Sequence, residues 1–488
     1  MRQGGRTSRL EGGHPSGSEW RHPSEGEKAP GASPHLFVHL AVLFLAACLI
    51  WLPKAGAAGV EPEEQPAQAT GRLTDYLTVD LRLIAFGVCQ QPVESTQNPS
   101  NNFLKIPLYV GDVEARPDLR LSAGPLELGA KPRMRLDDSV WEEGSLTGRS
   151  HGDSDFYLNE YIARLKVREG LFVSYGRENL QWGPSFLFSP SNPFFQDNGR
   201  RNPYLEVPGM DFGRVVWVAS AALTFSFIAN TTEGLNRTTG PGAFLSSVPP
   251  PPFEPTYTVK ADYTGRDKYA SLILSHRKDG EGLAGFYGGW TVADAILLYG
   301  EGSVSQGSRG LYPEGDRFSP FGATMAPLHT HDPALYPALL AGGAYTLESK
   351  GTFSVEYAYY GPGYGPSDAE TYYGLRRKAA EAFDAPGMIS GLAQETLGET
   401  AITDLRFLRR NYALIQYSQP SIRNRIDLTF RWTQNLDDGS GQFTALAAYE
   451  LGKHVELFSV ATAAAGGKNT EFGSILGYEI MAGLQYTF

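Results

Sequence analysis

The chain has 488 residues, of which 19% are charged and 12% aromatic, with 56 glycines and a formal net charge of −11 at neutral pH. The charged fraction lies below the roughly 25% of soluble chains. The mean hydropathy of −0.27 is too low for a bundle of membrane helices, each of which needs about 20 consecutive apolar residues. Two cysteines exclude a disulfide scaffold and a cysteine-based metal centre. After these exclusions, the glycine- and aromatic-rich composition predicts a chain that folds mainly into β-strands.

The N-terminal segment predicts export from the cytoplasm. Basic residues precede the only continuously apolar segment, 36–52, and the small residues Ala55-Gly56-Ala57 that follow it form a signal-peptidase pattern. We therefore expect an N-terminal extension and cleaved signal peptide at 1–57, a short periplasmic segment at 58–75 and one barrel domain at 76–488. A membrane anchor and lipidation at Cys48 are the alternatives.

The charge balance of the exported part disfavours nucleic acid as a partner. Removing residues 1–57 leaves 36 basic and 49 acidic residues, a net charge of −13. Binding to a phosphate backbone needs clustered positive charge, which this balance does not supply. Cys89 is then the single remaining cysteine, and we expect it to be an inert strand residue.

The last eleven residues alternate with period two. Apolar side chains occupy one face of this segment, and small or polar side chains occupy the other. The length suits a tilted strand that crosses a bilayer, and the aromatic ends suit the girdles at the two membrane interfaces. Soluble strands average five or six residues. The apolar face comprises Tyr478, Ile480, Ala482, Leu484, Tyr486 and Phe488.

Eighteen segments are predicted to be strands, with sixteen as the alternative count. Short connections alternate with long ones, the longest being 362–405, where Tyr372–Phe383 is the one candidate helix. Outer-membrane barrels combine tight periplasmic turns with long extracellular loops. One strand face is expected to hold Phe156, Leu158, Glu160, Ile162 and Arg164 together. The predicted strands are 76–88, 109–121, 125–136, 155–167, 171–182, 210–219, 222–230, 255–264, 268–277, 282–292, 295–305, 336–348, 352–361, 406–418, 424–434, 442–451, 453–462 and 478–488.

These features predict an all-β fold: a transmembrane antiparallel up-and-down β-barrel of about eighteen strands. With its signal peptide and terminal Phe488, the chain resembles the Gram-negative outer-membrane β-barrels. The stretch Tyr175–Gly183, which holds Gly176-Arg177 and Trp182-Gly183, resembles a strand of porin-like and alginate-export-like barrels, as does Pro190-Ser191-Asn192-Pro193. An alginate exporter would imply a strongly cationic lumen, which an acidic chain does not favour.

The resemblance implies a location and a set of partners. The protein would lie in the outer membrane of a Gram-negative bacterium, in contact with lipid and lipopolysaccharide. Periplasmic chaperones and the barrel-assembly machinery would bind it during assembly. A homo-oligomer is a further alternative that the sequence does not decide. The assembly machinery would read the C-terminal strand through Tyr478, Ile480, Leu484, Tyr486 and Phe488.

A barrel of this size is too wide for its own side chains to fill. The loop 183–209 is the candidate constriction, because aromatic rings and an arginine pair could stack on and hydrogen-bond a sugar or carboxylate. The alternative is an external loop packed on its own aromatic side chains. Its candidate residues are Phe186, Phe188, Phe194, Phe195, Arg200, Arg201 and Tyr204.

Charged strand residues are expected to face the lumen, because a charge on the lipid face costs about 2–4 kcal/mol at mid-bilayer. A basic wall opposite an acidic wall would produce a transverse field that sets ion selectivity. The alternative is that Asp118 or Glu160 neutralises its neighbours. The basic candidates are Arg82, Arg116, Arg120, Arg133, Arg135, Arg164 and Arg214; the acidic ones are Glu301, Glu348, Glu356, Glu450, Glu456 and Glu479.

No enzyme motif is present, and we expect neither a cofactor nor a catalytic site. A metal site at His329-Thr330-His331-Asp332 is disfavoured, since a site needs three or four ligands. The predicted function is a porin-like channel that passes small hydrophilic solutes or saccharides by diffusion through a charged lumen. The alternatives are a dedicated polysaccharide export or surface-assembly barrel, and a closed structural or adhesion barrel that binds through its external loops.

Overall fold

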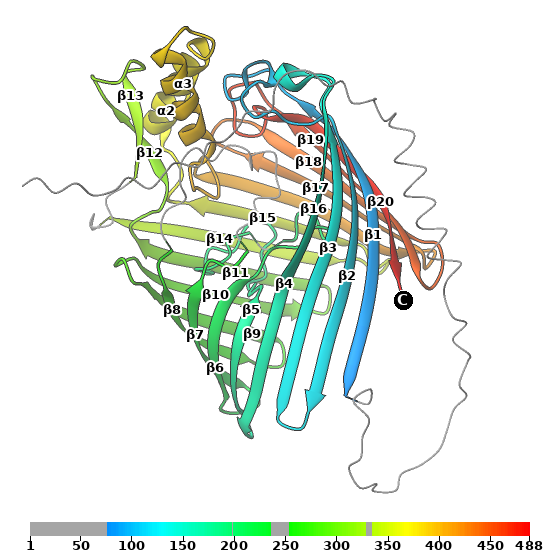
Figure 1. Cartoon of the computed structure of the whole chain (residues 1–488). Helices are drawn as coiled ribbons and strands as arrows, with labels where there is room; N and C mark the ends of the chain where they lie inside the picture. Colours follow the sequence, from blue (N-terminus) through cyan, green and yellow to red (C-terminus); the bar gives the residue numbers. More distant parts are fainter. Residues whose placement is uncertain (1–75, 198, 236–252, 328–333) are drawn as a thin grey trace, which may run out of the picture. The chain divides into compact units, whose positions relative to one another are not determined.

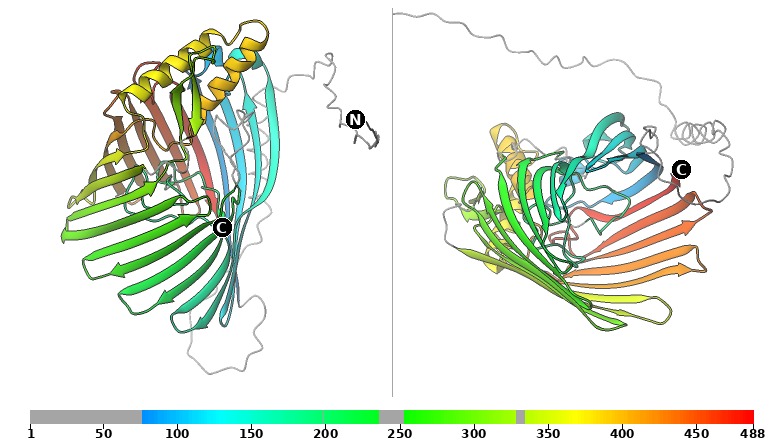
Figure 2. Two further views of the ribbon diagram at one scale, coloured as in Figure 1. Left: turned by 90° about the vertical axis from the view of Figure 1, so that its left-hand side faces the viewer. Right: turned by 90° about the horizontal axis from the view of Figure 1, so that it is seen from below.

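The computed structural model describes residues 76–197, 199–235, 253–327 and 334–488. Eighteen strands form one antiparallel sheet in which each strand pairs with the next along the barrel, and β1 pairs with β20 to close it (Figures 1 and 2). The predicted eighteen-strand antiparallel barrel is confirmed. The predicted signal peptide, its cleavage site, the 58–75 segment and the His329–Asp332 motif lie outside the described residues. None of the helices within the described ranges is long and apolar enough to cross a membrane.

The barrel strands agree with the predicted segments to within a few residues at most of their ends. The largest differences are β4, which begins at Ser150 instead of 155, and β16, which begins at Asn411 instead of 406; β5 ends at Glu178 instead of 182. The strands are β1 (Leu77–Pro92), β2 (Tyr109–Ala123), β3 (Leu126–Val140), β4 (Ser150–Arg168), β5 (Leu171–Glu178), β6 (Met210–Val218), β7 (Leu223–Thr232), β8 (Thr256–Thr264), β9 (Lys268–Arg277), β10 (Gly282–Ala293), β11 (Ile296–Gln306), β14 (Leu335–Thr346), β15 (Thr352–Tyr360), β16 (Asn411–Ile422), β17 (Ile426–Asn435), β18 (Gly441–Glu450), β19 (Val455–Ala465) and β20 (Leu476–Thr487).

On β9 and β20 the two faces of the strand differ as the period-two pattern predicts. On β9, Leu272 and Leu274 are 65% and 64% exposed, whereas Ile273 between them is 1% exposed. On β20, Ile480 is exposed and the adjacent Met481 is buried. Alternate side chains therefore point outward as an apolar band and inward to the lumen, which is the arrangement of a barrel in lipid.

One predicted face is wrong, on β4. The pairing of β3 with β4 shifts by one residue, so that Lys131 pairs with Glu160 but Pro132 pairs with Leu158. A β-bulge of this kind changes which face the following residues occupy. Phe156 therefore points outward and is 70% exposed, while Glu160 points inward and bonds Lys131. The predicted common face of Phe156 and Glu160 does not exist.

Two insertions at the long-loop end of the barrel form a packed unit, which we call the surface insertion (Figure 1). It contains the hairpin β12 (Leu311–Gly315) and β13 (Ala323–Pro327) and the helices α2 (Pro366–Glu381) and α3 (Met388–Ala401). The hairpin and both helices share one buried apolar cluster. The long connection 362–405 is therefore mostly helical, and the single helix predicted at 372–383 begins earlier and is followed by a second. Two short 3-10 turns, η2 (Pro99–Asn101) and η3 (Gly144–Leu146), lie in other long loops.

The residues at the start of α2 favour the beginning of a helix. Pro366 occupies its first turn, where no backbone donor is needed, and Asp368 accepts a hydrogen bond from the Gly365 amide at 3.1 Å. α3 follows Gly387, whose φ of 75° lies in the region that glycine adopts without strain. The buried face of the two helices comprises Ala369, Tyr372, Leu375, Ala379, Ala393 and Leu397.

Candidate constriction in the lumen

The described residues 179–197 and 199–209 lie between β5 and β6, and we call this segment the lumen loop. Five prolines, the first of them Pro184, interrupt it, and a proline cannot donate to a strand ladder, so this segment cannot form a continuous strand. Its side chains and backbone contact inward-facing residues of β2, β3, β6, β11, β15, β17, β18 and β19. The loop therefore lies inside the barrel, and the external-rim alternative is wrong.

Two buried glutamates of the barrel wall anchor the first half of the lumen loop. Glu356 on β15 accepts hydrogen bonds from the backbone amides of Phe186, at 2.7 Å, and Leu187, at 2.9 Å. Tyr299 on β11 donates to the same carboxylate at 2.8 Å. Both Glu356 and Glu301 are only 1% exposed. Buried carboxylates are stable only when donors surround them, and the loop supplies most of these donors.

Glu301 on β11 binds three serines of the same loop. Ser185 donates to one carboxylate oxygen at 2.9 Å, and Ser189 and Ser191 donate to the other at 2.5 and 2.7 Å. The Ser191 amide also donates to Glu301, at 3.2 Å. Glu301 and Glu356 thus hold adjacent parts of the loop, and they do not form an open acidic surface.

Arginine side chains of the barrel wall anchor the second half of the loop, whereas glutamates anchor the first half. Arg133 on β3 donates to both carboxylate oxygens of Glu206, at 2.6 and 2.7 Å. These hydrogen bonds hold the pKa of Glu206 below its ordinary value, although burial by itself raises it. Arg116 on β2 donates to the Tyr204 carbonyl at 3.0 Å. The bidentate geometry makes Arg133–Glu206 a specific attachment rather than a diffuse charge contact.

Aromatic residues of the loop pack on the wall. Tyr204 stacks on Phe458 of β19 with ring centroids 3.8 Å apart and donates to Glu456 at 3.0 Å. Phe194 and Phe195 pack edge-on against Phe212 of β6. These rings hold the loop in place, so the predicted role of Phe194 and Phe195 as pore-facing aromatics is not supported by their positions.

Two arginines of the loop reach the lumen water. Arg200 and Arg201 are both exposed. The Arg200 guanidinium lies 5.2 Å from the centre of the Phe186 ring, and Arg431 of β17 lies 5.6 Å from the same ring. Arg201 contacts Gln442 of β18 at 3.3 Å. We call Phe186, Arg200, Arg201 and Arg431 the arginine shelf. Arg200 and the buried Arg431 lie over the Phe186 ring, and the exposed guanidinium groups of Arg200 and Arg201 can bind carboxylates.

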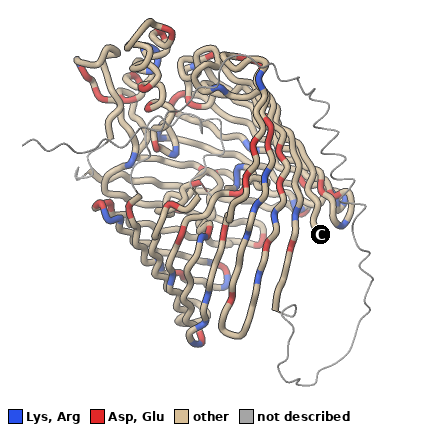
Figure 3. The backbone as a smooth tube through the Cα atoms, viewed as in Figure 1, with Lys and Arg blue, Asp and Glu red and all other residues tan. Residues whose placement is uncertain are grey.

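The remaining wall arginines do not form an open basic surface. Each of those below has a carboxylate within 4 Å, so the predicted transverse field is replaced by local pairing, which was the alternative. Figure 3 shows basic and acidic positions interleaved along β1 to β5. The pairs are Arg82–Asp118, Arg116–Glu114, Arg120–Glu127, Arg133–Asp118, Arg135–Asp112, Arg164–Glu127 and Arg214–Glu178.

Two predicted lumen residues lie away from the loop. Glu348 is exposed in the turn between β14 and β15, at the short-turn end of the barrel. Arg120 is near the same end, with its side chain 71% exposed and 3.8 Å from Glu127. Neither residue contacts the lumen loop, so neither belongs to this constriction.

The sequence pattern missed several residues that contact the loop or belong to its anchors. Among them are Asp197 and Glu206 of the loop itself, Arg406, which precedes β16, and Arg431. Arg431 could have been found from its alternation opposite Leu428 and Phe430. The pairing of Arg406 with Asp197 at 3.2 Å joins residues 209 positions apart and has no local signal.

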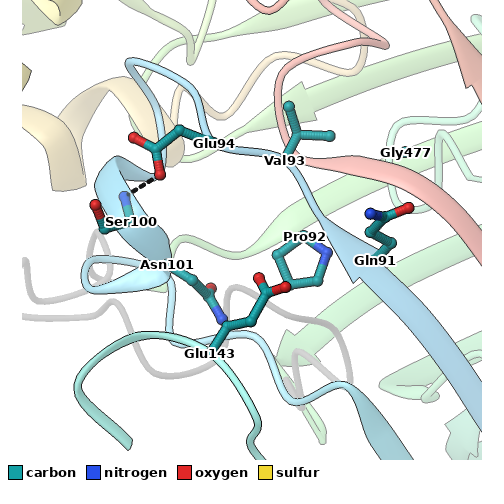
Figure 4. A pocket seen from close by; sticks show the side chains of 8 residues that line it. All are labelled: Gln91, Pro92, Val93, Glu94, Ser100, Asn101, Glu143 and Gly477. Carbon is teal, nitrogen blue, oxygen red and sulfur yellow. Dashed lines mark hydrogen bonds between the residues drawn. The ribbon is translucent and has the colours of Figure 1, made fainter. Parts of the chain in front are cut away.

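A separate pocket opens at the long-loop end, outside the lumen (Figure 4). It measures about 450 Å³ and is lined by side chains of the β1–β2 loop, including Glu94 and Asn101, and by Glu143. Glu94 already accepts a hydrogen bond from the Ser100 amide at 2.7 Å. A smaller hollow of about 270 Å³ lies along β1 to β5 between the paired wall charges. Within the described ranges, no three histidine, cysteine, aspartate or glutamate residues are placed to hold a metal ion.

Comparison with known proteins finds likeness only among solved structures. No protein-family model and no curated protein matches the sequence. The barrel is similar to OccK7 (OpdD) of Pseudomonas aeruginosa, with a TM-score of 0.49 and 14% identity over 84% of this chain and 98% of that one.

Two further structures of the same kind are similar. OprD of Pseudomonas aeruginosa has a TM-score of 0.48 and 10% identity over 86% of this chain and 96% of that one. OccAB3 of Acinetobacter baumannii has a TM-score of 0.45 and 10% identity over 84% and 99%. At these scores the likenesses assign no solute and carry no argument for function. They also lend no support to the alginate-export resemblance.

Proposed function

We propose that the chain is an outer-membrane channel through which small hydrophilic solutes diffuse, with the lumen loop as its constriction. The observation that carries this proposal is the path of residues 179–209 across the barrel, anchored at Glu301, Glu356 and Arg133. An eighteen-strand barrel leaves an aqueous interior unless a plug fills it. A loop that is anchored on several sides narrows that interior in a defined place without being a separate plug domain.

The arginine shelf supports a preference for anions. The arginines of the wall are paired with carboxylates. Arg200 donates to the Pro184 and Gly183 carbonyls, and both Arg200 and Arg201 are exposed. Fixed cations at the narrowest part of a pore favour anions and exclude cations. Carboxylates, which arginine binds in a fork geometry, and saccharides with acidic groups are the solutes that this shelf would accept best.

The outward face of β20 supports the location. Ile480 and Phe488 are exposed on the outer surface of a closed barrel, as are Leu272 and Leu274 on β9. We propose that this band contacts outer-membrane lipid. We also propose that the assembly machinery recognises Tyr478, Ile480, Leu484, Tyr486 and Phe488.

The experiment is single-channel recording of the refolded protein in a planar bilayer under a salt gradient. We expect a steady open conductance whose reversal potential indicates anion preference. Arg200→Ala with Arg201→Ala should reduce this preference and raise the conductance, because both bulk and charge leave the constriction. Arg317→Ala, which removes one positive charge from the surface insertion, is the control for a loss of charge outside the lumen.

A folded, heat-modifiable barrel that leaves the bilayer sealed would reject the diffusion channel and favour the closed barrel. An open channel whose reversal potential is the same in the double variant and in Arg317→Ala would reject the role of the arginine shelf.

A further inference from the structure

The segment 402–410, which we call the strap, connects α3 to β16 and touches both the surface insertion and the lumen loop. Toward the insertion, the Thr403 carbonyl accepts a hydrogen bond from the Leu311 amide of β12 at 2.9 Å. Leu405 packs against the apolar cluster of the insertion and also against the cluster of the barrel interior. The strap is therefore continuous with the core of both regions.

Toward the lumen, the strap contacts the loop at two residues. Arg406 pairs with Asp197 at 3.2 Å and donates to the Leu187 carbonyl at 3.3 Å. Phe407 lies edge-on to Phe188 with ring centroids 5.3 Å apart, and both rings are buried. The loop is thus held by the strap on the same stretch that Glu356 binds from the wall.

The strap itself is fixed to the wall beside these contacts. The Arg406 amide donates to the Tyr360 hydroxyl at 3.3 Å, and the Leu408 amide donates to Glu471 of the β19–β20 loop at 3.0 Å. Phe407 also stacks on Tyr412 with ring centroids 4.3 Å apart. A segment attached at both ends and in its middle behaves as a rigid support rather than a moving lid.

We propose that Arg406 and Phe407 are positioning residues for the constriction, and that the surface insertion delivers them to the lumen loop. This inference rests on the proposed channel function, because a constriction matters only in an open channel. The position of the lumen loop can nevertheless be tested without measuring current. It assigns the insertion a role inside the barrel: the helices outside the lumen determine where the loop lies within it. Arg406 acts through Asp197 and Leu187, and no contact of Arg406 with a passing solute is required.

Two arginines in the loop make its position measurable without any current. Trypsin cleaves after Arg200 or Arg201 only when that part of the loop leaves the lumen, because a protease cannot enter the barrel. When opening is fast, the cleavage rate follows the population of the open loop. We expect Arg406→Ala to raise cleavage at this point by about tenfold, since a partly buried ion pair and a charged hydrogen bond are both lost.

The controls separate position from charge and from folding. Arg317→Ala removes an arginine from the same insertion without a contact to the loop, and should leave cleavage unchanged. Asp197→Asn breaks the same ion pair from the loop side and should also raise cleavage, by less than Arg406→Ala, because the hydrogen bond from Arg406 to the Leu187 carbonyl remains. Asp197→Arg combined with Arg406→Asp restores an ion pair with reversed charges, and should return cleavage after Arg200 and Arg201 toward the wild-type rate, with cleavage after the new residue at position 197 counted separately by mass spectrometry.

The outcomes distinguish this inference from the proposed function. If the wild-type protein carries no current but is protected from trypsin, and Arg406→Ala is cleaved faster, the channel is rejected and the positioning role stands. If Arg406→Ala and Asp197→Asn are cleaved no faster than Arg317→Ala, or the wild-type loop is cleaved at once, the positioning role is overturned. If Arg406→Ala fails to fold, cleavage of Asp197→Asn and of the variant with the reversed ion pair tests the positioning role instead.

Discussion

Replacing Glu356 by glutamine tests whether the wall holds the lumen loop. The carboxylate accepts two backbone amides of the loop through separate oxygens, at 2.7 and 2.9 Å, and a tyrosine hydroxyl at 2.8 Å. Glutamine offers a single oxygen and turns an NH₂ group toward the remaining donor. At least one hydrogen bond to a charged acceptor is lost, which costs about 1.5–3 kcal/mol. Relief from burying a charge offsets part of this cost.

A net loss of about 2 kcal/mol would raise the population of the open loop by about 30-fold. The assay is the rate of tryptic cleavage at Arg200 and Arg201 in the refolded barrel, with channel conductance recorded in parallel. Glu348→Gln is the matched control, because Glu348 lies in an exposed turn away from the loop. If Glu356→Gln is as resistant as Glu348→Gln and conducts like wild type, the anchoring argument is refuted.

Three further predictions concern other parts of the barrel. Glu301→Gln should increase tryptic cleavage of the same loop, because one oxygen cannot accept hydrogen bonds from all three serines. Cleavage at the wild-type rate would show that the Glu301 carboxylate is not needed to hold the loop. Burial raises the pKa of Glu471 to about 7, so the β19–β20 loop should be most stable below about pH 4.5 and lose up to about 3 kcal/mol as the pH rises to about 7. Hydrogen exchange, corrected for its intrinsic pH dependence, should show this loss, and Glu471→Gln should remove it. Leu274→Arg should cost about 2–4 kcal/mol of folding free energy in lipid vesicles, and an unchanged midpoint of denaturant unfolding would contradict an outward, lipid-facing Leu274.

The period-two pattern was sufficient to predict the barrel. A side chain on a strand points to one of two faces, so an apolar residue at every second position determines which face meets lipid. This is why β20 was predicted with both its bounds and its apolar face nearly correct, and β9 was predicted with its bounds correct. The same rule failed on β4, where one bulged residue reverses the faces without any mark in the composition.

The sequence by itself indicated about eighteen strands, with sixteen as the alternative, the sorting of short turns and long loops, and the inward direction of most wall charges, because each depends on neighbours along one strand or on the distance between strands. Only the tertiary structure decided that residues 179–209 lie in the lumen and that Glu301 and Glu356 bind them rather than face water. It also decided that Arg406, beyond two helices, pairs with Asp197. These contacts join residues more than a hundred positions apart, and which donor meets which acceptor across a closed barrel depends on register and loop path, which no local pattern encodes.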